Sequence, residues 1–545
     1  MQLLPLTRRP TAGSWFCLLA LASLLELPAV ALTRATAAEP AVESAMVVCP
    51  KVFRDALQPW LDYRRGQGMQ VRVFGAEPTP EALRSSLQEA RVPSDRFVLI
   101  IGDAPVIGTP TDATREVPVH YRKTTVTAAF GSTPTFPTDA PYGDLDGDGQ
   151  TELAVGRLPV KTPAQFTSII ERIRAYEGSR DFSAWRGRMQ LIGGVGGFGI
   201  LADTAIESTT RLVLTSSLPP SVRASVLYGS PGHRFYPRKR FTESVIETYQ
   251  QGCRVWVYAG HGMIDRLDRV PSGPTGIPVL DSKTVQQLQC EPEKAPIAVL
   301  LCCYTGAIDA AVDSFAERMV RQPGGPIAVI AGSRVTMPYG NASLTLGMVD
   351  AFHGRRSTSD DPKQESVRPA ERLGDLFLQA LQRLEAKSIT ETSQVQSLVD
   401  TLSTLVSPAG SSLVEERREH ASLYGLLGDP LLKLHPPQPV EVTTDAGFDA
   451  GAPVRVRINS PIAGRCLVML DRPLGNVKRS QPGEPVVDPN DLTITSQSMD
   501  VKPNETSELS IELSQEHQGL LRIRVHVDGE STWASGGTQT NIRPR

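Results

Sequence analysis

The sequence predicts an α/β protein of two side-by-side α/β halves, followed by a C-terminal β-sandwich. Three observations support this fold class. Strand and helix patterns alternate from Met46 to residue 185, the alternation resumes after residue 186, and short alternating strands follow residue 440. Such β-α-β alternation is typical of a mostly parallel sheet covered by helices. A chain of 545 residues also suffices to bury a sizeable core.

The first half contains three predicted strands separated by two helices. The strands are the apolar runs AMVVC, QVRVFG and RFVLIIGD, and the helices cover residues 55–65 and 80–90. Pro80 stands in the first turn of the second helix, where its missing N–H would have no partner in any case. In the second half, the predicted elements are the strands MQLIGG, ASVLYG, RVWVYAG, PIAVLL and PIAVIAGS and helices over residues 203–214, 243–251, 373–384 and 393–406.

The C-terminal region follows the segment HPPQPV, which predicts a linker. Its expected strands are the short alternating runs VEVTT, VRVRINS, RCLVMLD, LTITS, ELSIELS and LRIRVHVD. Strands of this spacing, over about 105 residues, favour a β-sandwich of immunoglobulin type. The predicted divisions of the chain are a signal segment (1–38), an N-terminal α/β subdomain (39–185), a second, catalytic α/β subdomain (186–436) and the sandwich (440–545).

The N-terminal segment has the pattern of a secretory signal. Arg8 and Arg9 precede the apolar stretch 15–25, and small residues offer cleavage after Ala31 or Ala37. Because Glu26 interrupts the apolar run, we expect no membrane span once the signal is removed. The predicted location is periplasmic, secreted or at the cell surface. A net charge of −3 gives no support for nucleic-acid or anionic-membrane binding.

A histidine and a thiol follow two of the predicted strands. RVWVYA runs into Gly260-His261-Gly262, and PIAVLL delivers Cys302 and Cys303 to a glycine-containing turn, 42 positions beyond the histidine. The carboxyl ends of neighbouring parallel strands meet at one crevice. A histidine and a cysteine that meet there can act as base and nucleophile. One of two consecutive strand residues must point inward, and we expect that residue to be Cys302.

The same turn suggests how the chemistry would be assisted. An ordinary thiol is only a few per cent ionised at pH 7, so an adjacent imidazolium would increase the thiolate fraction of Cys303. The backbone N–H groups of Gly262 and Cys303 are candidates for an oxyanion hole. Helical spacing of apolar residues between positions 312 and 320 predicts a helix that places Cys303 near its N-terminus.

An acidic loop is the second motif that indicates a site. Asp144, Asp146, Asp148 and Glu152 alternate with glycines in DLDGDGQTE, a pattern that can surround a hard cation with oxygen ligands. The loop begins like an EF-hand, but its twelfth position is Val155 and no helix pair flanks it. We therefore predict structural Ca²⁺ here, while an acidic surface turn without metal stays open.

Other motifs are absent or weak. The chain has no HExxH, no CxxC and no GxSxG, so neither a zinc mechanism nor a serine α/β-hydrolase is supported. The segment GVGGFG (194–199) matches GxGxxG, but no acidic residue follows at the position that would bind a ribose. We expect a glycine-rich loop close to the crevice instead. Cys253 and Cys290 could pair as a disulfide, although spacing alone does not fix the connectivity.

At this point a family resemblance is evident. YAGHG, followed by an apolar strand that ends in CYTG, resembles the active-site signature of the gingipain-type cysteine peptidases, which have a caspase-like fold. The similarity runs from Met46 to Leu434. It includes the segments VLIIGD, DAPYGDLDGDGQTELAVGRLP, IIERIRAYE and YGLLGDPLLKL. The resemblance implies two caspase-like α/β/α halves and an immunoglobulin-like domain after them.

The resemblance also implies residue roles. His261 takes the position of the catalytic histidine, and Cys303 that of the nucleophile, because the family pattern places the cysteine three residues before the glycine that is here Gly306. No cofactor is needed for catalysis. Relatives place an acidic partner of the histidine in the glycine-rich loop, where this chain has only Gly and Val. A third catalytic residue is therefore not carried over.

Substrate preference is encoded only weakly. Selective relatives use an acid at the base of the substrate pocket, and Asp203 and Glu207 are the nearest acids after the glycine-rich loop. Residues 332–340 follow the third strand and are expected to form a pocket wall, with Tyr339 as its aromatic residue. Both acids could equally be solvated helix residues, which is the commoner outcome.

These observations predict an exported cysteine endopeptidase that acts on proteins or peptides through a Cys-His dyad and a thioester acyl-enzyme. Two alternatives stay open. The chain could be a non-catalytic adhesion or secretion-machinery module that keeps the fold and binds a surface or secretion partner through its C-terminal domain. It could also be a transpeptidase, in which an amine rather than water intercepts the acyl-enzyme.

Overall fold

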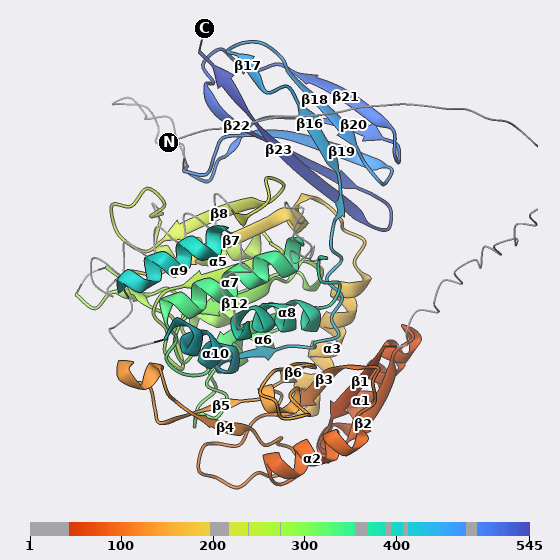
Figure 1. Ribbon diagram of the computed structural model, residues 1–545, viewed down its shortest axis with the longest axis vertical. Coiled ribbons are helices and arrows are strands. Elements are labelled where there is room, and N and C mark those ends of the chain that lie inside the picture. The colour runs from red at the N-terminus through yellow and green to blue at the C-terminus, as the bar shows by residue number, and fades with distance from the viewer. Residues whose placement is uncertain are drawn as a thin grey trace, which may run out of the picture. The chain divides into compact units, whose positions relative to one another are not determined.

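A ten-stranded sheet forms the centre of the α/β part of the chain (Figure 1). The computed structural model describes residues 43–196, 217–237, 239–272, 274–354, 368–386, 394–406, 412–475 and 488–544. The predicted signal segment therefore lies outside the described residues. The strands, in sheet order, are β2 (Gln70–Phe74), β1 (Ser44–Val48), β3 (Asp95–Ile101), β6 (Ala154–Leu158), β14 (Tyr424–Leu427), β13 (Ala328–Gly332), β12 (Ile297–Leu301), β9 (Val255–Ala259), β7 (Arg188–Gly193) and β8 (Arg223–Tyr228).

Strand β14 joins the two sides of this sheet. The strands of the first half, β2, β1, β3 and β6, pair in parallel. Strands β13, β12, β9, β7 and β8 also pair in parallel, so the mostly parallel sheet that the sequence predicts is present. Between them β14 runs antiparallel to β13 and parallel to β6. One continuous sheet therefore spans both halves.

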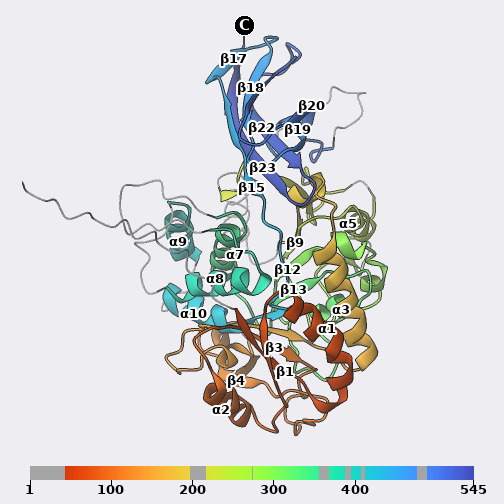
Figure 2. The ribbon, with the colours of Figure 1, turned by 90° about the vertical axis from the view of Figure 1, so that its right-hand side faces the viewer.

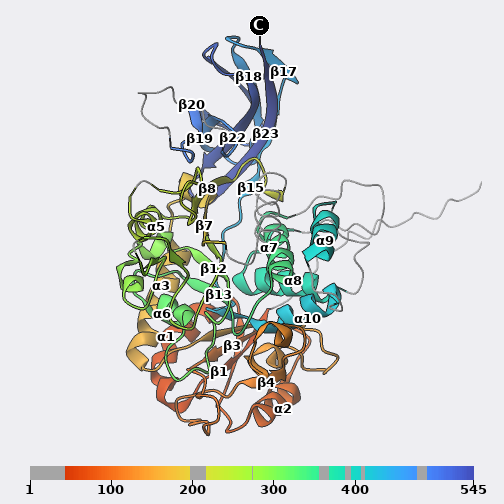
Figure 3. The same cartoon turned by 90° about the vertical axis from the view of Figure 1, so that its left-hand side faces the viewer.

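Helices cover both faces of the sheet. In Figures 2 and 3, α7 lies on one side of β12 and α5 on the other. One core unites the strand residues that face α1, α3, α7 and α8, and a second core lies between the sheet and α5 and α6. The helices are α1 (Arg54–Gly66), α2 (Pro80–Ala90), α3 (Pro163–Gly178), α5 (Phe241–Gln250), α6 (Phe315–Arg321), α7 (Pro338–His353), α8 (Leu373–Glu385), α9 (Gln394–Val406) and α10 (Leu413–Leu423).

Helix starts follow local capping chemistry. The Thr79 hydroxyl accepts a hydrogen bond from the Ala82 N–H at the start of α2, and Pro80 stands at the first helical position, as predicted. At the start of α6, Ser314 and Glu317 form a reciprocal capping box. Such caps supply acceptors for the N–H groups that the first turn of a helix leaves unpaired.

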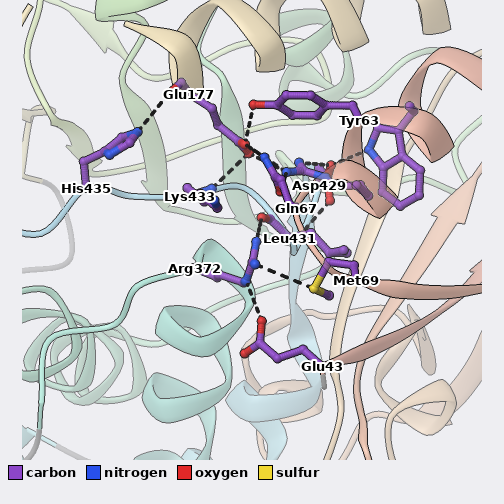
Figure 4. A network of polar contacts seen from close by, with 12 residues as sticks. Glu43, Tyr63, Gln67, Met69, Glu177, Arg372, Asp429, Leu431, Lys433 and His435 are labelled. Atoms are coloured by element: carbon purple, nitrogen blue, oxygen red, sulfur yellow. Dashed lines mark hydrogen bonds and ion pairs between the residues drawn. The ribbon is translucent and has the colours of Figure 1, made fainter. Parts of the chain in front are cut away.

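A buried polar network fastens the first half to the strand that joins the sheet. The Arg64 guanidinium in α1 contacts Glu177 at 2.8 Å and Asp429, just after β14, at 2.7 Å. Tyr63 donates to Glu177 as well, and Figure 4 shows Tyr63 and Lys433 at the Glu177 carboxylate. This network joins α1 to the end of β14. Separating the two would leave buried charges without a partner, which is energetically costly.

The C-terminal residues form two sheets around a core of their own. The larger sheet holds β15 (Gln438–Pro439), β17 (Gly447–Asp449), β19 (Gly464–Asp471), β20 (Thr493–Val501), β22 (Gly519–Asp528) and β23 (Trp533–Arg543). The smaller holds β16 (Glu441–Thr444), β18 (Val454–Asn459) and β21 (Thr506–Ile511). The Trp533 indole N–H donates to the carbonyl of His435, which anchors β23 to the linker.

Two further features bear on the sequence predictions. The six cysteines within the described residues are free thiols, so Cys253 and Cys290 are not bonded to each other. Among the described residues, no helix is both long enough and apolar enough to cross a membrane.

Candidate active site

The turn after β12 separates two neighbouring thiols. Cys302 continues the inward alternation of the strand and is 1% exposed, with its sulfur 3.4 Å from the Thr305 hydroxyl. Burial raises the pKa of Cys302 far above that of an ordinary thiol. Cys303 is half-buried instead, so its sulfur can meet a substrate. The prediction that Cys302 is the core residue of the pair agrees with this placement.

The Cys303 thiol is held by the segment after β13. The Thr336 N–H points at the Cys303 sulfur at 3.4 Å, and the thiol lies 3.7 Å from the Thr336 carbonyl. The next N–H, that of Met337, donates to Nε2 of the buried His420 at 2.7 Å. Burial lowers the pKa of His420 to about 4, so its ring stays neutral and keeps this acceptor. The segment behind the thiol is therefore fixed from both sides.

The helix predicted from residues 312–320 is present as α6, but it does not extend back to Cys303. Tyr304 has a positive φ of 60° and begins a series of turns, and α6 starts only at Phe315. Cys303 therefore does not lie at a helix N-terminus, and no helix dipole assists it. The capping box of Ser314 and Glu317 sets the true start of the helix, and that motif was visible in the sequence.

The turn after β9 lies directly against the cysteine turn. A Cβ added to Gly262 would lie 2.7 Å from the Cys303 carbonyl oxygen and 2.8 Å from the Cys302 sulfur. Real Cβ atoms do not approach so closely, so only glycine permits this contact. Because β9 and β12 pair in parallel, with Ala259 opposite Leu301, both turns leave the same edge of the sheet. Gly262, the residue that follows His261, thus touches the cysteine turn.

Asp268 lies beside His261, although the sequence did not single it out. An antiparallel bridge pairs Gly262 with Leu267, so His261 and Asp268 are opposite each other on one face of a short ladder. The Tyr258 hydroxyl contacts both residues, donating to the His261 carbonyl at 2.8 Å and accepting from the Asp268 N–H at 3.2 Å. No sequence spacing predicts such a pairing. The one available signal for Asp268 is that an acidic residue follows GHG within a few positions.

The environment of the Asp268 carboxylate is also well defined. Its Oδ1 accepts from the Arg269 N–H at 2.7 Å and its Oδ2 from the Val195 N–H at 3.2 Å. Burial raises the pKa of Asp268, while the Arg269 N–H and His261 act in the opposite direction. Val195 belongs to the glycine-rich loop, and a Cβ on Gly194 would lie 3.1 Å from Asp268 Oδ2. Residues 197–199 of that loop lie outside the described residues.

Comparison with known families decides the identity of the chain. Residues 39–435 match the model of peptidase family C25. The chain belongs to peptidase family C25. It is a cysteine-type peptidase, a hydrolase whose substrates are proteins or peptides and whose catalysis requires no cofactor. The gingipain resemblance seen in the sequence is thereby confirmed. A search of curated proteins returned no match.

Solved structures agree with this fold. The Arg-specific cysteine proteinase gingipain R is 15% identical, with a TM-score of 0.50 over 93% of this chain and 99% of that one. A structure described as a protease is 14% identical, with a TM-score of 0.51 over 92% and 98% of the two chains. At these identities the likeness concerns the fold alone, and it places this C25 peptidase in a gingipain-like mixed α/β fold.

Of the three predicted pocket residues of this C25 peptidase, the structure describes only Tyr339. Asp203 and Glu207 lie outside the described residues. Tyr339 is only 4% exposed, because residues 338–353 form helix α7 instead of an open pocket wall. Its hydroxyl donates to Asp400 at 2.7 Å and accepts from Arg417 at 3.2 Å. The assignment of Tyr339 to a substrate pocket is therefore corrected: the residue belongs to the interior.

The four acids of the predicted metal loop come together in the C25 peptidase. One carboxylate oxygen from each of Asp144, Asp146, Asp148 and Glu152 lies within 4.8 Å of the others. Burial raises the pKa of Glu152, and the charges of Asp146 and Asp144 raise it further. The Oε2 atom of Glu152 has no hydrogen-bond partner, and Arg91 is 3.8 Å away. The loop therefore concentrates negative charge.

A second acid cluster is neutralised by the protein itself. It combines Asp103, Asp313 and Glu317, whose carboxylates also lie within 4.8 Å of one another. The Lys161 ammonium lies 3.2 Å from Asp103 and 2.5 Å from Asp313. The arginines nearest Asp144 are 4.0 Å away. The ion pairs that these arginines and Arg91 make with the loop of residues 144–152 are therefore longer, at 3.8–4.0 Å, than those that Lys161 makes in the second cluster.

Proposed function

We propose that this chain is an exported cysteine endopeptidase in which Cys303 is the nucleophile and His261 the general acid and base. The observation that supports this assignment is the contact of Gly262 with the backbone of Cys303, which brings the histidine turn against the accessible thiol. Cys302 is excluded as nucleophile because burial keeps its thiol protonated and away from solvent.

The proposed reaction has two stages. The Cys303 thiolate attacks the carbonyl carbon of the scissile peptide bond, and His261 donates its proton to the nitrogen of the leaving amine, which leaves a thioester. Water then attacks the thioester carbonyl while His261 takes up one proton from it. The carbon–sulfur bond breaks, the product departs as a carboxylic acid that loses its remaining proton to solvent, and the thiolate and imidazolium are restored.

The oxyanion of each tetrahedral intermediate would be bound by the N–H groups of Gly262 and Cys303. The contact between the two turns supports this role, because both N–H groups belong to backbone that packs together at one point. Donors fixed in advance need no reorganisation during the reaction, and one such donor contributes about 10²–10³ in rate.

Asp268 would serve as the positioning residue for His261. It occupies the opposite position on the short ladder, and the Tyr258 hydroxyl fixes the backbone of both residues. A carboxylate beside the imidazole can orient the ring and balance the charge of the imidazolium. This role would compensate for the glycine-rich loop, whose Gly194 and Val195 offer no acidic side chain.

The experiment is turnover of a mixed peptide library under reducing conditions. Cys303→Ala is expected to lower kcat/KM by at least about 10⁴, since removal of a covalent nucleophile leaves only binding and oxyanion stabilisation. Cys302→Ala is the matched control next to it and should retain activity within about tenfold. Full turnover by Cys303→Ala, with loss in Cys302→Ala, would refute the assignment.

We also propose that residues 144–152 bind a structural Ca²⁺ through the four carboxylates. The donor set fits a hard cation that prefers oxygen ligands, and the unpartnered Oε2 of Glu152 lies within it. The ion would brace the loop that leads into β6 and take no part in catalysis. We expect Ca²⁺ to raise Tm relative to excess chelator by mass action.

Single substitutions in the two acid clusters distinguish Ca²⁺ binding at residues 144–152 from a general effect of salt on Tm. Asp146→Asn should abolish the rise in Tm that Ca²⁺ causes, whereas Asp313→Asn, in the cluster that Lys161 neutralises, should keep it. An equal rise in both variants, or no rise in the natural chain, would remove the proposal.

The gingipain resemblance also supports a proposal for the division of the chain into domains. We propose that the two sides of the ten-stranded sheet correspond to two caspase-like halves, with boundaries at residues 39–185 and 186–436. The two C-terminal sheets would form an immunoglobulin-like sandwich over residues 440–545, available to a surface or secretion partner. Residues 1–38 would direct export to the periplasm or the cell exterior, which N-terminal sequencing of the exported protein would test.

A further inference from the structure

A cavity lined by two buried arginines lies far from the catalytic turns, and its role goes beyond the proposed function. It lies where β7 and β9 begin and is closed by α7 and the start of β23. Its empty space is about 670 Å³, including its opening to solvent. We call it the arginine cavity, after Arg186 and Arg254 in its wall. Cys303 follows the opposite, carboxyl end of β12.

Arg254 is a buried, charged residue in the wall of this cavity. The residue is 6% exposed, and its guanidinium lies over the rings of Phe352 and Trp533, at 5.2 Å and 5.8 Å from the ring centres. Its Nη2 has no hydrogen-bond partner. Burial lowers the pKa of Arg254 to about 10, with Arg186 adding to the decrease. No carboxylate among the described residues offsets this charge.

Arg186 repeats the pattern nearby. It is 2% exposed and stacks over Phe182 at 4.9 Å and Trp185 at 4.7 Å. Its Nε donates to the Asp181 carbonyl at 2.8 Å, but its Nη2 is without a partner. Burial lowers the pKa of Arg186, and the charges of Asp181 and Asp528 compensate only in part. Two buried guanidinium groups, each with one nitrogen that has no hydrogen-bond partner, thus line the same cavity.

The rest of the wall is mainly apolar. Its apolar members include Met189, Val257, Val299, Met348 and Val349. A buried guanidinium without a counter-charge is costly, and a planar carboxylate matches its donors in geometry and sign. We propose that the arginine cavity binds a carboxylate that carries an apolar body. Arg254 and Arg186 hold the carboxylate, and the apolar wall takes the body.

Two sources can supply this chemistry, a lipid-derived acid or a peptide with an apolar C-terminal residue. Calorimetric titration of the full chain distinguishes them with two matched pairs of probes, octanoate against octanamide and N-acetyl-leucyl-leucine against its C-terminal amide. The carboxylate of at least one pair should bind at least tenfold more tightly than its amide. The pair with the higher affinity identifies the source.

Substitutions then locate the binding. Arg254→Met keeps a long apolar stem over Phe352 and Trp533 but removes the charge, and it should weaken carboxylate binding at least tenfold while amide binding stays unchanged. Arg186→Met gives the same test if the first variant does not fold. Arg455→Met is the matched control, because it removes a charge from the exposed face of β18. Equal binding of carboxylate and amide, no binding of either, or undiminished binding in both cavity variants would overturn the proposal.

Discussion

The two ends of strand β9 differ in how their polar groups are paired. At the carboxyl end, His261 lies opposite Asp268, and the Tyr258 hydroxyl contacts the backbone of both. At the amino end, the Arg254 guanidinium is buried with one nitrogen unpartnered. One end therefore has its compensating groups within the chain, as the proposed catalysis would require. The other end has an unmet charge, which suits the binding of a ligand.

The contact at the carboxyl end can be broken with a single methyl group. Gly262→Ala should lower kcat/KM by about 10²–10³, because the new Cβ would collide with the Cys303 carbonyl and displace one proposed oxyanion donor. Gly425→Ala in β14 is the control, since nothing lies within 4 Å of the Cβ it would add. Steady-state kinetics measures both. Activity of Gly262→Ala within threefold of the natural enzyme would contradict the proposed contact.

Removal of the charge opposite His261 should have a smaller effect. Asp268→Asn is expected to lower kcat by about 10–10² with little change in KM, because an amide cannot balance an imidazolium in the transition state. Asp268→Glu should restore part of the loss. Asp265→Asn, an exposed neighbour on the same turn, serves as control. If kcat is unchanged in Asp268→Asn, the residue is only structural.

At the amino end of β9, removal of the charged group should increase the stability of the protein, whereas the substitutions at the carboxyl end should lower its activity. Arg254→Met without ligand should raise the free energy of unfolding by about 1 kcal/mol, since relief of the buried charge exceeds the lost stacking on two rings. Chemical denaturation of the natural chain and the variant at pH 7 measures the difference. A loss of more than about 2 kcal/mol would mean that the chain already compensates this charge, and the contrast between the two ends would disappear.

The meeting of the histidine and cysteine turns at one edge of the sheet could be predicted from sequence. Apolar strands that end in GHG and CCYTG reveal both turns, because parallel strands deliver their carboxyl ends to one side of a sheet. Asp268 could not be predicted because its position depends on one isolated β-bridge, between Gly262 and Leu267, which has no periodicity in the sequence. Tyr339 was misplaced because Pro338 starts a helix there, at a position where proline is well tolerated.

Strand β23 shows a different reason for a miss. It is the longest strand of the larger C-terminal sheet, yet its sequence, WASGGTQTNIR, is rich in glycine and polar residues. It pairs with β22 along its whole length and also with β15 and β17. Neighbouring strands impose its extended conformation, and such tertiary selection leaves no local signal in the sequence.

The late position of β14 in the chain affects the order of assembly. Residues 424–427 must insert between β6 and β13, and the Ser333 N–H beside the active edge then donates to the Leu423 carbonyl. Because synthesis begins at the N-terminus, the position between β6 and β13 stays empty until nearly all of the α/β part has been made. A polypeptide that ends before β14 therefore lacks both the strand between β6 and β13 and the carbonyl that accepts from the Ser333 N–H.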